Sequence, residues 1–299
     1  MNNKLTNGDL PVFINKFGGT ANAVIKQLEK APGITVYALP PDEMTEAIQR
    51  AVDRGLPRIA VSGGDGTLAL AAGIVANSNT EMAILPGGTL NHFAKRLNIP
   101  LDIGAALQLA LTGTASQIPF GMVNDQLFLN TSSVGAYVTF VQTREKLENK
   151  LPYSVASFFA AIRRLYHFRQ LDVRIDGQWS RTPLVFVGVG ERELQLPTLG
   201  DNKYAGKTGL HLIILRCSNG WAALSLAIQA MLRGVDPLAR EQQLEHAILQ
   251  SVEVTPHSRK KWITVSADGE LLRLMAPLHY QFHSQGLNVI TPDEEDSLP

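Results

Sequence analysis

The sequence predicts an α/β fold in two parts, an N-terminal doubly wound parallel sheet followed by a C-terminal antiparallel β-sandwich. In residues 1–115, short apolar runs alternate with stretches of helical length, which is typical of a parallel sheet covered by helices. From about residue 116, apolar runs follow one another through tight turns, which favours antiparallel strands. We therefore place residues 1–116 in a first domain, residues 117–290 in a second domain and residues 291–299 in a tail.

The first domain is expected to contain four strands in its parallel sheet. The apolar runs are "PVFIN", "TVYALP", "RIAVSG" and "EMAILPG", and each pair of consecutive runs is separated by enough residues for a helix. The second domain is expected to contain strands at "LFLNTS", "LDVRID", "PLVFVGVG", "LHLIILR", "SVEVTP", "WITVSAD" and "LHYQFH". Longer helices are predicted near residues 152–168 and 220–234, and the final strand is expected to pack back on the first domain.

Composition limits the classes of function. The 299 residues are 45% hydrophobic, so the chain can bury a large core. Lys plus Arg and Asp plus Glu both number 27, so no global positive field attracts nucleic acid, and we expect no nucleic-acid partner. The single cysteine excludes an internal disulfide, and we find neither a signal peptide nor a transmembrane segment. These features predict a cytoplasmic protein.

The bend after the third predicted strand reads "SGGDGT" and has the chemistry of a phosphate-binding loop. Gly63, Gly64 and Gly66 leave main-chain N–H groups uncovered, and the following helix directs its positive end toward the same place. Thr67 adds a hydroxyl. The negative charge of Asp65 predicts either binding of a metal-linked group or a brace made through neighbouring N–H groups. A simple strand-to-helix turn capped by Asp65 is the alternative.

The fourth predicted strand ends in a similar bend, "LPGGTLNHFAKRL". Gly88 lies at this bend, and Thr89 and Asn91 open the next helix. Because the carboxyl ends of parallel strands share one edge of a sheet, both bends should lie side by side there. The first strand adds Asn15 and Lys16 to the same edge. Neither a Walker lysine motif nor a G-x-G-x-x-G motif is present, so the common nucleotide-binding motifs do not apply.

Together, "SGGDGT" and "LPGGTLNHFAKRLNIP" resemble the diacylglycerol kinase catalytic domain, which diacylglycerol, sphingosine and related bacterial lipid kinases share. The segments "FLNTSSVGAY" and "VSADGELL" are similar to later parts of that family, so the resemblance spans most of the chain. It implies ATP as cofactor, Mg²⁺ carried on its phosphates, and transfer of the γ-phosphoryl group to a lipid hydroxyl. The substrate would be a lipid alcohol at a membrane surface, diacylglycerol-like or sphingoid, and the protein could then bind the membrane peripherally.

The resemblance also implies roles for individual residues. The nucleotide would be held by residues of the three bends: Asn15, Lys16, Gly63, Gly64, Asp65, Gly66, Thr67, Gly88, Thr89 and Asn91. Asp65 would also act in catalysis, and Asp268 or Glu270 would accept the proton of the lipid hydroxyl. The residues themselves allow a simpler interpretation, because Asp-Gly is a favoured two-residue hairpin turn and "VRIDGQW" has the same pattern.

Several positions depart from the family pattern. The segment "GERELQLPTLG" replaces one that usually contains Asn, and Thr208 stands where many members have an aspartate of a structural Mg²⁺ site. We therefore predict that no metal is bound by the protein's own side chains. The loop "NKFGGTA" lacks the usual Pro and Ser, and "ALPP" lacks a common nucleotide-contacting Thr. These departures leave open a nucleotide-binding regulatory module without catalysis. A further alternative is phosphorylation of a soluble nucleoside as in NAD kinases, which also carry a G-G-D-G-T loop.

The predicted helix at residues 152–168 has two interpretations. Its apolar residues recur at helical spacing, with Arg163, Arg164 and Arg169 nearby. It could be a core helix with a solvated basic face, or a helix that contacts the membrane surface.

Overall fold

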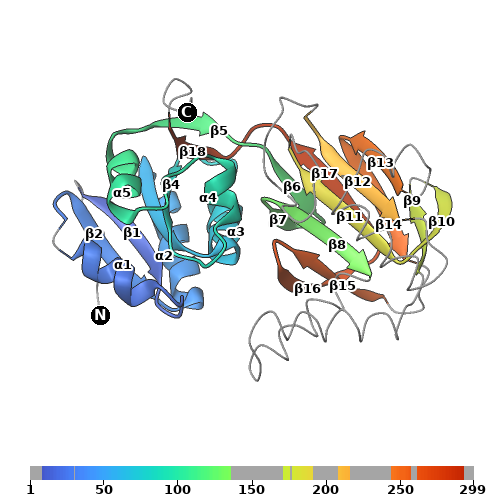
Figure 1. Ribbon diagram of the computed structural model, residues 1–299, viewed down its shortest axis with the longest axis horizontal. Helices are drawn as coiled ribbons and strands as arrows, with labels where there is room; N and C mark the ends of the chain where they lie inside the picture. The colour runs from blue at the N-terminus through green and yellow to red at the C-terminus, as the bar shows by residue number, and fades with distance from the viewer. Residues whose placement is uncertain are drawn as a thin grey trace, which may run out of the picture. The chain divides into compact units, whose positions relative to one another are not determined.

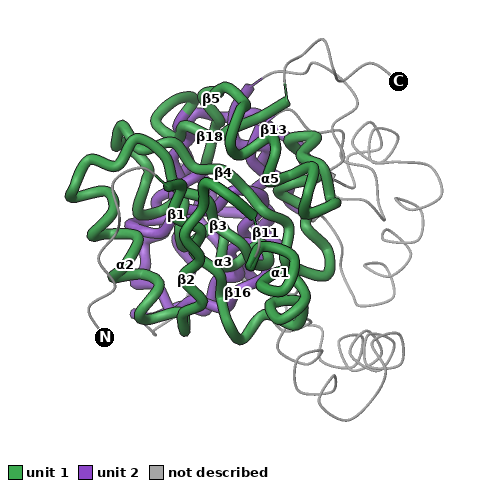
Figure 2. Tube along the Cα trace, turned by 90° about the vertical axis from the view of Figure 1, so that its left-hand side faces the viewer, with its two compact units in different colours: residues 1–120, 284–299 green, residues 121–283 purple. Residues whose placement is uncertain are grey.

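The computed structural model describes residues 9–29, 31–135, 171–175, 177–190, 208–215, 244–256 and 261–292. The chain forms two compact units, unit 1 with Met1–Phe120 and Ser284–Pro299, and unit 2 with Gly121–His283 (Figures 1 and 2). The helices predicted at 152–168 and 220–234, and the family departure at 191–200, lie outside the described residues.

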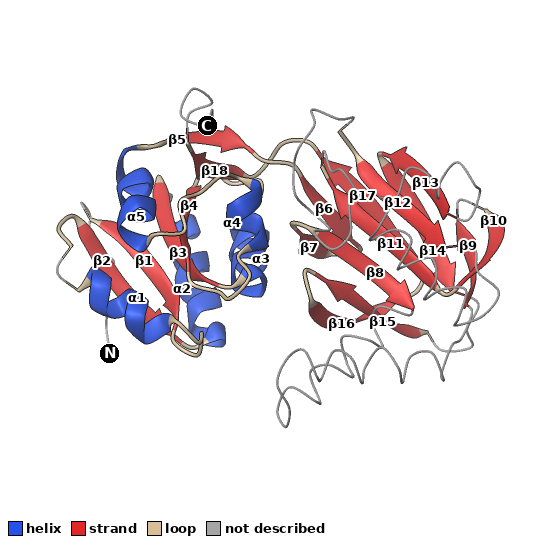
Figure 3. Ribbon diagram, in the orientation of Figure 1, coloured by secondary structure: helices blue, strands red, loops and turns tan. Residues whose placement is uncertain are grey.

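Unit 1 is an α/β layer structure. Its elements in chain order are β1 (Leu10–Asn15), α1 (Ala21–Leu28), β2 (Ile34–Leu39), α2 (Pro41–Asp53), β3 (Arg58–Gly63), α3 (Asp65–Val75), β4 (Glu81–Pro86), α4 (His92–Arg96), α5 (Ile103–Thr112), β5 (Thr114–Gln117) and β18 (Asn288–Thr291). Helices α2 and α3 pack together on one side of the sheet, and α1 and α5 pack together on the other (Figure 3). This arrangement confirms the predicted doubly wound sheet.

The strand order of the unit 1 sheet places a topological switch point at β1 and β3. The order is β2-β1-β3-β4-β18-β5, and β1 to β4 run parallel. The chain moves outward from β1 to β2 and then returns past β1 to β3, so the loops after β1 and β3 leave in opposite directions. Ligands of open α/β sheets bind beyond the carboxyl ends of the strands at such a point. The loops after β1, β3 and β4 are therefore the place to look for a site.

A strand that the sequence analysis did not identify, β18, returns to unit 1, whereas the last predicted strand, "LHYQFH", is β17 (Leu278–His283) and pairs with β14 (Ser251–Pro256) in unit 2. β18 lies between β4 and β5, parallel to β4 and antiparallel to β5. The bounds of the units consequently differ from the predicted domains: the second unit ends at His283 instead of residue 290, and residues from Ser284 on belong with unit 1. The first unit ends at Phe120, four positions beyond the predicted 116.

Unit 2 is built from two six-stranded sheets. Its strands are β6 (Phe120–Val123), β7 (Gln126–Phe128), β8 (Thr131–Gly135), β9 (Leu171–Ile175), β10 (Gln178–Thr182), β11 (Leu184–Val189), β12 (Leu210–Leu215), β13 (Leu244–Leu249), β14 (Ser251–Pro256), β15 (Trp262–Ala267), β16 (Glu270–Met275) and β17 (Leu278–His283). One sheet has the order β10-β9-β14-β17-β6-β7 and the other β13-β12-β11-β8-β15-β16. The strand pairs given by register are antiparallel, which confirms the predicted second fold.

The core of unit 2 takes alternate residues from both sheets. Val252, Val254 and Tyr280 come from one sheet, and Val187 and Leu212 from the other. The buried Tyr280 hydroxyl lies 3.2 Å from the Ser132 hydroxyl of β8, and burial raises the pKa of the Tyr280 phenol well above its usual value. The hydrogen bond therefore gives a polar partner to a group that the core would otherwise leave unsatisfied.

The predicted strand "LFLNTS" is interrupted in the structure. β7 ends at Phe128 and β8 begins at Thr131. Between them, the N–H groups of Leu129 and Asn130 donate to the Asp268 carboxylate and not to a neighbouring strand. The Asp268 side chain, far away in the sequence, thus interrupts a segment that the local sequence pattern predicts as one continuous strand.

Candidate functional site

The bend between β3 and α3 is shaped by glycines that allow very close contacts. A Cβ atom on Gly63 would lie 2.5 Å from Cβ of Thr67, so the Thr67 side chain folds back over the bend. Gly64 is the N-cap residue of α3, and no side chain caps this helix. Because the first N–H groups of a helix have no partner within it, the first turn of α3 offers donors to a bound anion.

The bend after β4 packs directly against the bend after β3. Gly87 N–H donates to the Gly63 carbonyl at 3.2 Å, and a Cβ on Gly88 would lie 2.6 Å from Cα of Gly64. Asn91 adopts a left-handed conformation with φ 50°, and its side chain is hydrogen-bonded in both directions to the Gly88 backbone, at 2.9 and 2.8 Å. The two bends therefore lie side by side at one edge of the sheet.

Asp65 joins the two bends through its carboxylate. It accepts hydrogen bonds from the N–H groups of His92 at 3.2 Å and Phe93 at 2.8 Å, the first two residues of α4. The negative charge of Asp65 thus compensates the positive end of α4. The sequence suggests two roles for Asp65, and the structure shows the second: its carboxylate accepts hydrogen bonds from backbone N–H groups. Those N–H groups belong to the segment after β4 and not to the bend that contains Asp65.

The loop after β1 is attached to both bends. Asn15 Nδ2 donates to Thr67 Oγ1 at 3.1 Å, which links the loops on the two sides of the switch point, and the Thr20 hydroxyl donates to the Gly87 carbonyl. Lys16 is exposed, with its ammonium 5.3 Å from the centre of the Phe17 ring. Sequence reasoning did not identify Thr20, because its partner lies 67 residues away and no local signal predicts that contact.

These contacts determine which groups are available to a ligand. The Gly88 N–H is used by Asn91, and the N–H groups of His92 and Phe93 are used by Asp65. The first turn of α3, formed by Asp65, Gly66 and Thr67, has no capping side chain, and Thr89 is exposed beside it. Backbone donors, the Thr89 hydroxyl and the exposed Lys16 ammonium of the loop after β1 suit a phosphate group, and the absence of side chains at Gly64 and Gly88 lets the two bends approach closely.

The second group of predicted residues lies in unit 2, at the β15–β16 hairpin. Ala267 pairs with Glu270, and both turn residues have positive φ, 48° at Asp268 and 89° at Gly269. This geometry matches the Asp-Gly type I′ turn that the sequence pattern predicts. The Asp268 carboxylate accepts three backbone N–H groups, from Leu129 at 2.6 Å, Asn130 at 2.7 Å and Thr131 at 2.9 Å. Asp268 therefore fixes the hairpin to the β7–β8 segment.

Glu270 differs from Asp268 in its surroundings. It is exposed at the first position of β16, and among the described residues no hydrogen bond or ion pair engages its carboxylate. Of the two carboxylates proposed as proton acceptor, Glu270 is the one left available by its neighbours.

Metal-binding and membrane-spanning features are not found in the described part of the chain. No group of three or more His, Cys, Asp or Glu side chains there is arranged to hold a metal ion. None of the helices there combines the length and apolar character needed to cross a lipid bilayer. Thr208 itself is exposed.

Comparisons with known proteins agree with this geometry. Residues 9–123 match the family described as diacylglycerol kinase catalytic domain. The chain is 34% identical over 152 residues to a probable lipid kinase YegS-like of Serratia proteamaculans, covering 48% of this chain and 49% of that protein. It is 43% identical over 108 residues to a protein of the same description from Pseudomonas aeruginosa, covering 35% of each. The matches thus span about half the length of these curated relatives or less.

The likeness to solved structures extends over both units. A crystal structure described as a diacylglycerol kinase from Bacillus anthracis aligns with 96% of this chain and 98% of its own, with a TM-score of 0.70 and 22% identity. A second structure, described as a putative diacylglycerol kinase from the same organism, aligns with a TM-score of 0.69 and 20% identity over 95% and 98% of the two chains. At this level of identity the likeness establishes the fold.

Proposed function

We propose that this protein is an ATP-dependent lipid kinase, because residues 9–123 match the family described as diacylglycerol kinase catalytic domain. The observation that carries the proposal is the pair of packed bends after β3 and β4, beside an α3 N-terminus that no side chain caps. Such an arrangement of N–H donors suits a phosphate group, and relatives described as probable lipid kinases match up to about half of this chain.

The bends would hold the polyphosphate of ATP. The N–H groups at the first turn of α3 would bind phosphate oxygens, with the Thr89 hydroxyl and the Lys16 ammonium as further donors. Asp65 would act by keeping the two bends together, since its carboxylate is already engaged by α4. Mg²⁺, carried in with the nucleotide, would supply neutralisation of phosphate charge during transfer.

Glu270 would accept the proton of the lipid hydroxyl. In the proposed reaction the lipid oxygen forms a bond to the γ-phosphorus, the bond from that phosphorus to the bridging oxygen of ADP breaks, and the hydroxyl proton passes to a carboxylate. The exposure of Glu270 supports this assignment, as does the engagement of Asp268 by three N–H groups. The acceptor would be a diacylglycerol-like or sphingoid alcohol, reached by peripheral binding to a membrane.

The test is a transfer assay with γ-labelled ATP, Mg²⁺ and detergent-dispersed lipids, including diacylglycerol, phosphatidylglycerol, a sphingoid base and ceramide. We expect label in one lipid class and none when Mg²⁺ is chelated. Tight ATP binding without transfer to any lipid would contradict the proposal and support a regulatory nucleotide-binding module. Label in a soluble dinucleotide, with NAD added as acceptor, would instead indicate an activity of the NAD kinase type.

A further inference from the structure

Two large apolar side chains face each other on the surface of the β15–β16 hairpin. Trp262 and Met275 are directly opposite in the strand register, and their exposed fractions are 51% and 52%. β16 is the edge strand of its sheet. An adjacent exposed pair of this size is unusual on a surface that faces only water, and such clusters commonly mark an interaction site.

Two cations lie close to this pair in the sequence. Arg273 lies two residues before Met275 on β16 and so shares its face, and Lys261 directly precedes Trp262. In the sequence, Lys261 ends the longest uninterrupted run of cations in the chain, Arg259 to Lys261, although the net charge is zero. Neither Lys261 nor Arg273 forms an ion pair with any described residue. The positive charge here is therefore local and available to an anionic partner.

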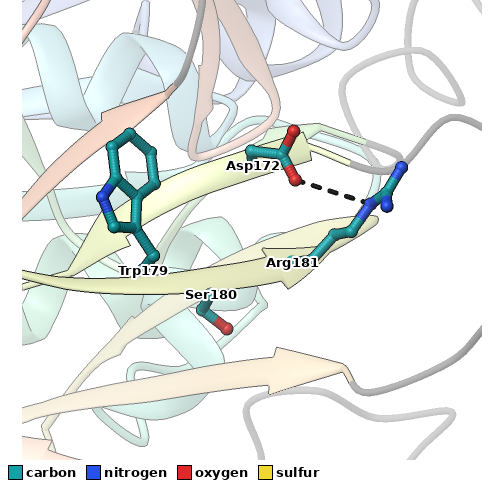
Figure 4. A pocket seen from close by; sticks show the side chains of 4 residues that line it. All are labelled: Asp172, Trp179, Ser180 and Arg181. Carbon is teal, nitrogen blue, oxygen red and sulfur yellow. Dashed lines mark ion pairs between the residues drawn. The ribbon is translucent and has the colours of Figure 1, made fainter.

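Another exposed tryptophan of the same unit shows what distinguishes this pair. Trp179 on β10 is 61% exposed, but the cation nearby, Arg181, is paired with Asp172 at 3.4 Å (Figure 4). That cation is thus compensated, whereas Arg174, directly opposite Trp179 in the register, donates to the Gly177 carbonyl. Because no large exposed apolar side chain lies opposite Trp179, it provides a natural control for an exposed indole without an apolar partner.

We propose that Lys261, Trp262, Arg273 and Met275 form a docking patch for an anionic lipid surface. Indole rings partition to the boundary between headgroups and acyl chains, a methionine side chain adds apolar area, and cations are attracted to anionic headgroups. The same hairpin carries Glu270 just after its turn, so the patch and the proposed proton acceptor belong to one two-stranded element. The identity of the partner rests on the proposed lipid kinase function.

Vesicle sedimentation tests the patch without ATP or an acceptor. Full-length protein is mixed with vesicles of phosphatidylcholine alone or with about one third phosphatidylglycerol. We expect binding to the anionic vesicles that weakens with salt. The double variant Trp262→Ala/Met275→Ala should lower vesicle affinity at least about tenfold, and Lys261→Ala or Arg273→Ala about fivefold each. Trp179→Ala should bind like the wild type.

The controls separate this proposal from the proposed function. Thermal unfolding of each variant verifies folding, and Trp262→Phe should retain most of the binding. Phosphoryl transfer to a detergent-dispersed acceptor should be unchanged in the double variant, because that assay does not require docking to a membrane. If the wild type transferred phosphate to no lipid, the kinase proposal would fail, but vesicle binding would still test the patch. Equal binding by the wild type and the double variant would overturn the patch. The patch would also be overturned if the wild type bound no vesicles but formed a dimer in solution that the double variant could not form. That result would assign the surface to a second copy of the chain.

Discussion

Two aspartates in the two units have the same structural task. Asp65 in unit 1 accepts two N–H groups from the start of α4, and Asp268 in unit 2 accepts three from the β7–β8 segment. Each lies at a glycine-containing bend, and each connects that bend to a segment from another part of its unit. The two bends differ in the groups that they leave available to a ligand. The bend of Asp65 leaves the uncapped N–H donors of α3, and the bend of Asp268 leaves the Glu270 carboxylate.

The two aspartates position other segments, and different groups are left for the proposed chemistry. Both aspartates belong to short acidic motifs that suggest catalysis, yet backbone donors already engage both carboxylates. Under the proposed function, a bound anion would meet the positive end of a helix in one unit, and a substrate proton would pass to the Glu270 carboxylate in the other. Substitutions at Glu270, Asp65 and Gly88 test that division.

The largest effect is expected at Glu270. Glu270→Gln removes the proposed proton acceptor and should lower turnover by about 10²- to 10⁴-fold in the lipid transfer assay. Because the side chain is exposed, the free energy of unfolding should change by less than about 0.5 kcal/mol. Asp268→Ala is the matched comparison, and it should lower the free energy of unfolding by on the order of 3 kcal/mol, because three N–H groups lose their acceptor. Full turnover in Glu270→Gln would move the proton acceptor elsewhere.

A smaller loss is expected at Asp65. Asp65→Ala leaves the N–H groups of His92 and Phe93 without an acceptor, so the bends should separate and turnover should fall roughly 100-fold, together with about 1–3 kcal/mol of stability. Asp65→Asn keeps one acceptor oxygen and should retain more of both. Turnover and urea unfolding measured on both variants test the brace. If the Asn variant loses activity as completely as the Ala variant while keeping its stability, the negative charge itself takes part in the reaction.

The smallest effect is expected from close packing of the bends. Gly88→Ala puts a Cβ 2.6 Å from Cα of Gly64, so the backbone must shift, at a cost of about 1–3 kcal/mol. ATP affinity measured by calorimetry should fall about tenfold or more. Gly19→Ala is the control, because nothing lies within 4 Å of a Cβ built there. Equal ATP affinity in the two variants would show that the bends can separate without consequence.

Much of the fold can be predicted from periodicity. Strand β3 follows from the apolar run Ile59–Val61 at its centre. Helix α2 follows from the helical spacing of its buried residues Met44, Ala47, Ile48 and Ala51. The parallel order then places the loops after β1, β3 and β4 at one edge. This is why the sequence alone places the bends after β3 and β4 side by side.

The contacts made by the site residues could not be predicted in the same way. The partners of Asp65, Thr20 and Asp268 lie at least 27 residues away, and hydrogen bonds of this kind leave no periodic signal. The sequence allowed Asp65 to bind a metal-linked group or to brace N–H groups, and only tertiary structure distinguishes the two. The break between β7 and β8 has the same origin, because it depends on a carboxylate 138 residues away.

The position of β18 constrains how the protein is made. Because this strand separates β4 from β5 in the sheet, the first unit lacks an interior strand until Asn288–Thr291 has been synthesised. During synthesis, all of unit 2 leaves the ribosome before β18 does, so the sheet of unit 1 keeps an unpaired edge until then. An expression fragment that stopped at residue 123, where the family match ends, would expose that edge to pairing between molecules.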